Sequence, residues 1–428
     1  MSNLLKSKIQ FKTCVLTLCR LSGIIFAYLF LAYLTYELNS LYRNPLYGIP
    51  GKLQKYVVYT RLSDNIQINV HKLRTKLELL NKERYIFNSD NFRSVEDDTP
   101  VLVVQVHRDI QRLQYLVLSL ARVRDIKDVL VVFSHSYYDE AINQLIRSID
   151  FCKVMQIFYP HSVQLHPHKF PGVDPNDCNG NVTEFCQYRD ARIAEKKQHW
   201  WWKANIIFEQ LKWLSKYEGL VLFLEEDNYV APDLLHVLRY IQKSFWYFPH
   251  VDVVSFGKPY RRGSRSDLLI LEPWQPPFHV GLAFNASVWK RIKFQNGDYC
   301  MYNDYNWNYS LLNMFHKFLK GHADMIACQT PRVLSTREFE SKEHFLKNIN
   351  QVVKNVEWFP EKIRAVYVFG PKGRVQPELS VPRRGVGGWA DIRDQMLCLD
   401  VLAVTTTEES RFYEEHYEHK SNGNETIM

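Results

Sequence analysis

Three consecutive acidic residues, Glu225, Glu226 and Asp227, directly follow the apolar run 221–224. An apolar run of this length, bounded by polar residues, is typical of a buried strand in a parallel sheet. Open α/β sheets bind ligands at the carboxyl ends of their strands, and carboxylate oxygens are ligands for hard divalent cations. The pattern therefore indicates a site where a cation could hold a diphosphate. A solvated acidic turn after a strand is the alternative.

Two other segments combine polar groups with aromatic rings. Residues 199–203 read His-Trp-Trp-Trp-Lys and fall in a predicted helix over 188–214. Consecutive tryptophans cannot all face one way on a helix, so we expect some in the core and others along a groove, unless all are structural. In the aromatic segment 298–308, Asp304 is a candidate general base, with a structural hydrogen-bond acceptor as the alternative. The basic loop 258–265 could face phosphate or acidic sugars, or simply be solvated.

The elements that must position these residues alternate along the chain between strands and helices. We expect strands at 101–107, 128–133, 154–158, 221–224 and 251–256, and helices at 113–120, 141–149, 188–214 and 232–244. This alternation predicts a parallel sheet with helices on both faces. No Gly-x-Gly-x-x-Gly motif follows the first strand, which argues against the usual dinucleotide fold and leaves other nucleotide-binding α/β folds open.

The N-terminus has the pattern of a membrane anchor. Lys6, Lys8 and Lys12 precede an apolar run over 13–36 whose part from 21 to 36 is uncharged. At ~1.5 Å per residue, that uncharged part alone is about 24 Å long as a helix. The lysines favour a cytoplasmic N-terminus, and without a small-residue cleavage site after the run we expect an uncleaved signal anchor.

This interpretation divides the chain into five parts. They are a cytoplasmic tail (1–12), a transmembrane signal anchor (13–36), a stem (37–98), a lumenal catalytic domain (99–402) and a polar tail (403–428). A small helical subdomain is the alternative for the stem. Asn-x-Ser/Thr triplets and cysteines outside the anchor fit an extracytoplasmic compartment. The triplets begin at Asn181, Asn285, Asn308 and Asn424, and the cysteines are Cys152, Cys178, Cys186, Cys300, Cys328 and Cys398.

The size and charge of the chain narrow the function classes. Its 428 residues suffice for a large core, and its net charge of +8 is modest for that length. No nucleic-acid-binding signature accompanies the charge, so nucleic acid is not an expected partner.

Seven motifs, taken together and in order, resemble those of the α-1,6-mannosyl-glycoprotein β-1,2-N-acetylglucosaminyltransferase family, N-acetylglucosaminyltransferase II. The resemblance covers about residues 101–398. The motifs are VQVH (104–107), FSH (133–135), FPGVDP (170–175), HWWWK (199–203), FLEED (223–227), YNDYNW (302–307) and GWADIRD (388–394).

This resemblance implies a GT-A-type glycosyltransferase with a Rossmann-like central sheet, preceded by a single transmembrane helix. It implies UDP-GlcNAc (UDP-N-acetylglucosamine) as donor, Mn²⁺ as cofactor, and the α-1,6-arm mannose of an N-glycan on a glycoprotein as acceptor. It also implies a type II protein of the Golgi membrane with a lumenal catalytic domain. The reaction would be one inverting displacement, in which a base deprotonates the mannose 2-hydroxyl and the metal stabilises the leaving diphosphate.

The same resemblance assigns residues to roles. Asp227 would hold the metal, and Asp304 and Asn308 would be the catalytic positions. The implied disulfides are Cys178–Cys186 and Cys300–Cys398. The donor would lie against Gln105, Val106, His107, Arg108, Asp109, Ser136, Gln198, His199, Glu225 and Glu226.

The chain departs from the family pattern inside this site. Where the family has Asn-Arg after the histidine of its first motif, this chain has Arg108-Asp109, and Ser136 replaces an aspartate on the uridine side. The family's second metal ligand is the histidine of a Pro-Arg-x-x-His run, and here Ser335 stands in that place. Asn308 occupies the position of the family's general base.

These departures leave three hypotheses. The chain is an active N-acetylglucosaminyltransferase with a rearranged site that uses Asp304 as base; or it is a related transferase with an altered donor or acceptor; or it is a non-catalytic relative that binds glycans or scaffolds Golgi partners. An asparagine has no useful basicity, and loss of a general base typically costs ~10²–10⁴ in rate.

Overall fold

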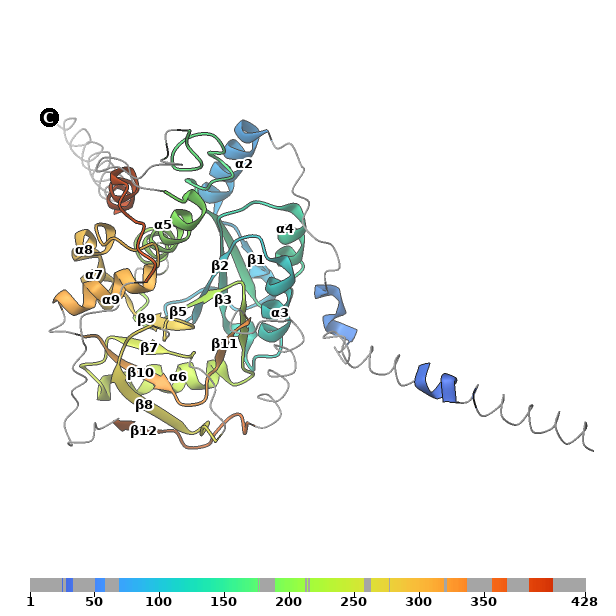
Figure 1. Cartoon of the computed structure of the whole chain (residues 1–428). Coiled ribbons are helices and arrows are strands. Elements are labelled where there is room, and N and C mark those ends of the chain that lie inside the picture. The colour runs from blue at the N-terminus through green and yellow to red at the C-terminus, as the bar shows by residue number, and fades with distance from the viewer. Residues whose placement is uncertain are drawn as a thin grey trace, which may run out of the picture.

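The computed structural model describes residues 25, 28–33, 51–57, 69–175, 177, 189–211, 214, 216–257, 263–276, 278–318, 322–336, 356–367 and 385–402. Within these residues, a ten-stranded mixed sheet forms the centre of the protein, with helices on both of its faces (Figure 1). Its strand order is β1-β4-β3-β2-β5-β9-β7-β10-β8-β12.

One half of the sheet is parallel, as the alternation of strands and helices predicts. Its strands are β4 (Lys153–Phe158), β3 (Leu130–His135), β2 (Val101–Val106) and β5 (Val221–Glu225). They pair in register from β4 to β5, all in the same direction. Nearly every side chain in them is buried, which explains why their sequences are continuous apolar runs rather than alternating ones.

The other half of the sheet is mixed, so the prediction of a wholly parallel sheet is wrong there. β9 (Leu282–Phe284) runs antiparallel to both β5 and β7 (Val253–Ser255). Strand direction depends on the path of the connecting chain, which a short apolar run does not reveal. The sheet continues with β10 (Asp324–Cys328), β8 (Leu268–Pro273) and β12 (Arg364–Tyr367). A separate antiparallel pair joins β6 (Asn228–Val230) to β11 (Val333–Ser335).

Two hydrophobic cores lie on opposite faces of the sheet, because alternate strand residues point to opposite sides. Leu102 and Val104 face the core shared with α3 (Ile110–Leu120), α4 (Glu140–Arg147) and α6 (Leu234–Ser244). Val101 and Val103 face the core that contains α5 and the helices after β9. These helices are α5 (Ala191–Asn205), α7 (Ala286–Phe294), α8 (Asn296–Cys300) and α9 (Trp307–Phe318).

The second half of the expected stem belongs to the folded domain, so the predicted boundary at residue 98 is too late. The helix α2 (Val70–Glu83) buries Leu73 and Leu77, and β1 (Ile86–Phe87) pairs antiparallel with β4. Before it, the 3₁₀ helix Gly51–Tyr56 ends in a buried tyrosine. The polar residues between these few apolar anchors dominate the composition, which is why the segment resembles a stem in sequence.

The expected membrane anchor lies mostly outside the described residues, which include only 25 and 28–33 of it. In the described part of the chain, no helix is both long enough and apolar enough to cross a bilayer. The polar tail 403–428 also lies outside the described residues.

A disulfide fastens the C-terminal segment to the domain. Cys300 and Cys398 are bonded, with their Cα atoms 5.6 Å apart, which confirms one of the two pairings that the family resemblance implied. The other pairing, Cys178–Cys186, lies outside the described residues. Cys152 and Cys328 are free and buried.

A buried ion network supports the same attachment. Arg189 donates to both carboxylate oxygens of Asp394, at 2.6 and 3.0 Å, and to the main-chain oxygens of Pro171 and Gly172. Arg393 donates to the carboxylate of Asp177 at 2.7 Å. The FPGVDP loop and the helix over residues 392–402 are thereby joined through charge-assisted hydrogen bonds, which are stronger than neutral ones.

Two of the predicted glycosylation triplets fall on described residues, and both asparagines have local roles. Asn285 caps α7 by accepting the Val288 N–H at 3.1 Å. Asn308 lies in α9 and is buried, as is Ser310 of the same triplet. An Asn308 glycan would have no room in the folded domain. Asn181 and Asn424 lie outside the described residues.

Candidate active site

The buried carboxylate of Glu226 organises the edge of the sheet where β2 and β5 end. Its main-chain N–H donates to the Gln105 carbonyl oxygen at 2.9 Å, which extends the ladder between the two strands. Its side-chain Oε2 accepts the N–H groups of His107 at 2.7 Å and Asp109 at 3.3 Å. Glu226 therefore shapes the turn between β2 and α3, and a charged acceptor makes these bonds stronger than neutral ones.

Asp109, one of the departures from the family pattern, has a local role in the structure. It is the N-cap of α3, and its carboxylate accepts the Arg112 N–H at 3.0 Å. Aspartate is among the preferred residues at this position. Arg108 stays exposed, with its guanidinium 4.0 Å from the ring centre of Tyr137.

A chain of hydrogen bonds connects the ends of three elements across this edge. Ser136 Oγ lies 2.7 Å from His107 Nδ1, and His107 Nε2 lies 3.1 Å from Gln105 Nε2. The Gln105 side-chain oxygen in turn accepts a hydrogen bond from the Lys203 ammonium of α5. Ser136 is itself fixed by its N–H, which donates to the Val106 carbonyl at 3.0 Å. The predicted donor residues of β2 and β3 are thus joined in one network.

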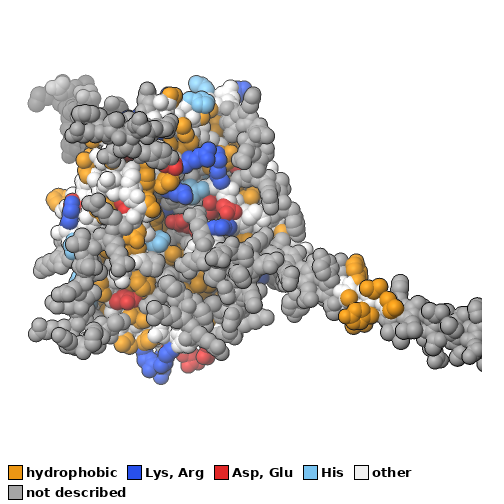
Figure 2. Space-filling model, in the orientation of Figure 1, with side chains coloured by type: hydrophobic (Ala, Val, Ile, Leu, Met, Phe, Trp, Pro, Cys, Tyr) orange, Lys and Arg blue, Asp and Glu red, His pale blue; other side chains and the backbone are white. Residues whose placement is uncertain are grey.

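The larger of two cavities at this edge has a volume of about 640 Å³. That volume is typical of pockets that hold drug-sized ligands. Five predicted donor residues lie in its wall: His107, Arg108, Asp109, Ser136 and Glu226. Figure 2 shows basic, acidic and histidine side chains close together in the upper half of one face of the protein. The cavity has the size and the mixed polarity that a nucleotide needs.

One wall of the larger cavity consists of residues that the sequence analysis did not single out. Arg192, Glu195 and Lys196 project into it from the first turns of α5. Their spacing of three and four residues places them on one helix face, a signal that was available in the sequence. Burial raises the pKa of Glu195 to about 7, even though its carboxylate accepts the Val163 N–H at 3.2 Å.

The smaller cavity, of about 210 Å³, holds the predicted metal ligand. Asp227 lines it together with Glu225 and Ser335. Because β11 pairs with β6, Ser335 lies opposite Asn228, and its hydroxyl is 3.3 Å from Asp227 Oδ2. The structure therefore brings the serine that replaces the family's histidine directly beside the carboxylate of the predicted metal ligand.

A lysine and a histidine complete the polar lining of the smaller cavity. Lys203 is buried, and burial lowers its pKa to about 7 against the opposing charge of Glu225. His279 comes from the turn before β9 and packs edge-on against Trp307, with ring centres 5.6 Å apart. The aromatic walls of this cavity are Trp200, Phe223 and Trp307. Trp200 and Trp307 stack with ring centres 4.5 Å apart, so the tryptophan motif serves both the core and a groove, as expected.

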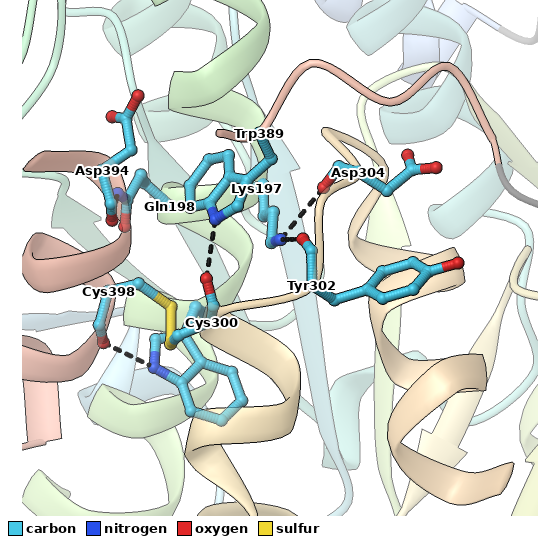
Figure 3. The surroundings of a disulfide bond; sticks show 9 residues. Lys197, Gln198, Cys300, Tyr302, Asp304, Trp389, Asp394 and Cys398 are labelled. Carbon is cyan, nitrogen blue, oxygen red and sulfur yellow. Dashed lines mark hydrogen bonds between the residues drawn. A yellow bond between two sulfur atoms is a disulfide. The ribbon is translucent and has the colours of Figure 1, made fainter. Parts of the chain in front are cut away.

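The two predicted catalytic positions do not line either cavity within the described residues. Asp304 is 0% exposed, and its carboxylate accepts the N–H groups of Asn306 at 2.8 Å and Gly387 at 3.5 Å. Figure 3 shows this carboxylate directed away from the Lys197 ammonium, which donates to the Asp304 main-chain oxygen. The Asn308 side-chain oxygen accepts the neighbouring Tyr309 N–H. The role of Asp304 as a base stays a prediction without support from this geometry.

Two predicted donor residues on α5 lie behind the cavities. Gln198 donates to the Asp394 carbonyl at 2.7 Å and so contributes to the attachment of the C-terminal segment (Figure 3). His199 is buried, stacks on Tyr159 and hydrogen-bonds through Nε2 to Ser134 Oγ at 2.7 Å. Burial holds the pKa of His199 well below its usual value, which makes it a neutral support for the network.

Comparison with known proteins agrees with this arrangement. The profile of the family described as N-acetylglucosaminyltransferase II (MGAT2) matches residues 74–398. Alpha-1,6-mannosyl-glycoprotein 2-beta-N-acetylglucosaminyltransferase of Homo sapiens is 33% identical over 378 residues, covering 78% of this chain and 80% of that protein. The protein of the same name from Arabidopsis thaliana is 30% identical over 344 residues, covering 74% and 78%.

Similarity to solved structures is weaker. Staphylococcus aureus TarS (residues 1–349) has 11% identity and a TM-score of 0.32, covering 60% of this chain and 71% of that one. A score of that size is too low to equate the two folds.

A mixed α/β sheet with two polar cavities at the carboxyl ends of its strands, in a chain with these relatives, defines a glycosyltransferase. Within that class, the chain belongs to the N-acetylglucosaminyltransferase II family. It is an N-acetylglucosaminyltransferase.

Proposed function

We propose that the protein transfers N-acetylglucosamine from UDP-GlcNAc, with inversion, to the 2-hydroxyl of the α-1,6-arm mannose of N-glycans, in a GT-A-type fold. The observation that carries the proposal is the position of Asp227 and Ser335 in the smaller cavity, directly beside the larger one at the ends of β2 and β5. The relatives named above act on that arm according to their names.

The chemistry of the donor set fits a hard divalent cation such as Mn²⁺. Asp227 and Ser335 offer a carboxylate and a hydroxyl oxygen 3.3 Å apart, and hard cations prefer oxygen ligands. In the part of the chain that the structure describes, no group of three or more His, Cys, Asp or Glu side chains could hold a metal. The site is therefore one whose coordination the donor's diphosphate would complete. A bound cation would supply electrostatic stabilisation of the leaving diphosphate.

The protein's own residues divide the donor between the two cavities. The larger cavity would take the nucleoside, with Arg192 and Lys196 available for phosphate oxygens. The smaller cavity, walled by Trp200 and Trp307, would take sugar rings, because aromatic faces pack well against apolar ring surfaces. Lys203, in the wall of the smaller cavity, is hydrogen-bonded to Gln105 and would hold the end of β2 in place.

The proposed location is the Golgi membrane, with a single transmembrane helix over 13–36 and a lumenal catalytic domain. The proposal is supported by the apolar run and the lysines before it. A fluorescent fusion together with protease protection of isolated membranes would test it, and a cytosolic domain would refute it.

Calorimetry of UDP binding, with and without Mn²⁺, and a transfer assay on a biantennary glycan would test the proposed function. We expect Mn²⁺-dependent UDP binding, product with the wild type, and loss of the metal dependence in Asp227→Asn. Asp90→Asn, which changes an exposed aspartate in the same way, is the control. A folded wild-type protein that binds no UDP, or that forms no product from any glycan with a free α-1,6-arm mannose, would refute the proposal.

A further inference from the structure

The proposed transfer needs a group that accepts the proton of the attacking hydroxyl, and the smaller cavity limits the choice. Its described lining has four side chains that could take or hold a proton: Lys203, Glu225, Asp227 and His279. Asp227 is the expected metal ligand. Lys203 already donates a hydrogen bond to the Gln105 side chain. Two candidates, His279 and Glu225, are left for the acceptor side.

The structure holds His279 in a fixed place on the cavity wall. Its ring packs edge-on against Trp307, which is itself stacked on Trp200. Two residues further on, Gly281 has a φ of +60°, and a Cβ atom there would come within 2.7 Å of Val333 Cγ2 on β11. Only glycine permits this close approach without strain. The turn that carries His279 is therefore pressed against the same strand that supplies Ser335.

His279 also has unused hydrogen-bonding capacity. Its Nδ1 is buried and finds no hydrogen-bond partner among the described residues. Buried polar atoms are nearly always paired in native proteins, and an exception calls for an explanation. Because Nδ1 itself is buried, a rotation of the ring that turns it toward a sugar hydroxyl in the cavity would supply the missing partner.

The charges around the ring suit a proton acceptor. Burial lowers the pKa of His279, so the imidazole is neutral and has a lone pair available at neutral pH. Glu225 acts in the opposite direction and raises that pKa, so it would stabilise the imidazolium once a proton arrives. The other charged groups of the cavity are Asp227, from the same edge of the sheet, and Lys203, from α5.

We propose that His279 is the catalytic base of this transferase, with Glu225 in the wall of the same cavity. The inference rests on the proposed function. In the step, the acceptor hydroxyl oxygen forms the new bond to the anomeric carbon of the donor sugar and its proton passes to the imidazole. The bond from that carbon to the diphosphate oxygen breaks, and its electron pair leaves with UDP. The imidazolium then returns the proton to solvent. His279 would accept the proton that Asp304 and Asn308 are not placed to accept, because the side-chain oxygens of both residues already accept main-chain N–H groups.

The test compares kcat, KM and UDP affinity among single variants. His279→Gln keeps the size and polarity of the side chain without its basicity. We expect kcat to fall by ~10²–10⁴, with UDP affinity by calorimetry and the KM for the glycan both within about 3-fold of wild type. Glu225→Gln should lower kcat less than His279→Gln does. His236→Gln, a histidine in α6 that bonds the Pro360 carbonyl, is the matched control and should leave kcat unchanged.

Chemical rescue separates loss of a base from loss of structure. In His279→Gly, added imidazole should raise kcat at least 10-fold, whereas the same addition to Asp304→Asn should leave kcat unchanged. The proposal is overturned if His279→Gln keeps kcat within 3-fold. It is equally overturned if Glu225→Gln or Asp304→Asn loses more kcat than His279→Gln while still binding UDP. A wild type that forms no product would instead refute the proposed function, so the two failures are distinguishable.

Discussion

Removal of the Glu226 carboxylate tests whether one buried acid holds the nucleotide cavity in shape. Glu226→Ala deletes the acceptor of two main-chain N–H groups, those of His107 and Asp109. Glu226→Gln keeps an acceptor oxygen that can take the place of Oε2 for both donors, but loses the charge that strengthens the two hydrogen bonds. The main-chain link between the Glu226 N–H and Gln105 stays in both variants.

The expected loss follows from the number of donors left without a partner. A buried N–H that loses its acceptor costs about 1–3 kcal/mol. Both donor residues are partly exposed, so water recovers part of that cost and the lower end applies to each. Glu226→Ala should therefore lower the free energy of unfolding by about 2–3 kcal/mol, and Glu226→Gln by about half as much.

Two measurements separate this prediction from general destabilisation. Denaturant unfolding gives the stability, and calorimetry at a temperature where all variants are folded gives UDP affinity. We expect at least 10-fold weaker UDP binding in Glu226→Ala, because the 107–109 turn forms part of the cavity wall. Glu218→Ala, at an exposed position, is the control. If Glu226→Ala matches this control in both stability and UDP affinity, the structural role argued for Glu226 is wrong.

Three further outcomes are expected. Burial raises the pKa of Glu195 from 4.5 to about 7, so between these pH values the folded state holds a proton that the unfolded state has lost. The free energy of unfolding should therefore fall as pH rises through this range, by at most ~1.4 kcal/mol per pH unit. Glu195→Gln should flatten this part of the stability profile, and an unchanged slope would contradict the assignment. The disulfide between Cys300 and Cys398 closes a loop with a sequence separation of 98, so Cys300→Ser should cost about 4 kcal/mol in denaturant unfolding, whereas a loss below 1 kcal/mol would show that the C-terminal attachment does not depend on it. Asp233→Asn leaves the fully buried Arg332 without its charge partner, which lies 2.9 Å away; a loss of about 3–5 kcal/mol is expected by the same measurement, and near-wild-type stability would disprove the pairing.

The parts of the fold that sequence predicts well are those whose local pattern has one interpretation. The runs at β2, β3, β4 and β5 are mostly apolar and alternate with amphipathic segments, a pattern that predicts a parallel half-sheet. The direction of β9 was not predictable, because three apolar residues carry no information about the route of the chain. The sequence left the 70–87 segment open between a stem and a small helical subdomain, because only a few buried side chains attach it to the domain.

The residues of the candidate site also differ in how far the sequence predicts their positions. Glu226 and Asp227 were predictable because parallel strands bring their carboxyl ends together, whereas Ser136 was assigned to the site by the family resemblance. Positions reached through long-range pairing have no local pattern. Ser335 is beside Asp227 because β11 pairs with β6, about a hundred residues earlier in the chain, and the family resemblance alone assigned it to that site. His279 enters the smaller cavity from an irregular turn, which no periodicity marks.

The dependence of α5 on the end of the chain has a consequence for biosynthesis. Gln198 and its partner Asp394 are 196 positions apart in the sequence. Arg189 and the same partner are 205 positions apart. At ~5–20 residues per second of synthesis, these polar groups emerge roughly 10–40 s before the segment that satisfies them. During that interval the helix that supplies both cavities lacks its C-terminal cover, and the Cys300–Cys398 disulfide that fastens this cover cannot yet form. A nascent chain of this enzyme would therefore present an unfinished, partly apolar surface to the folding machinery until almost the last residue of the domain is made.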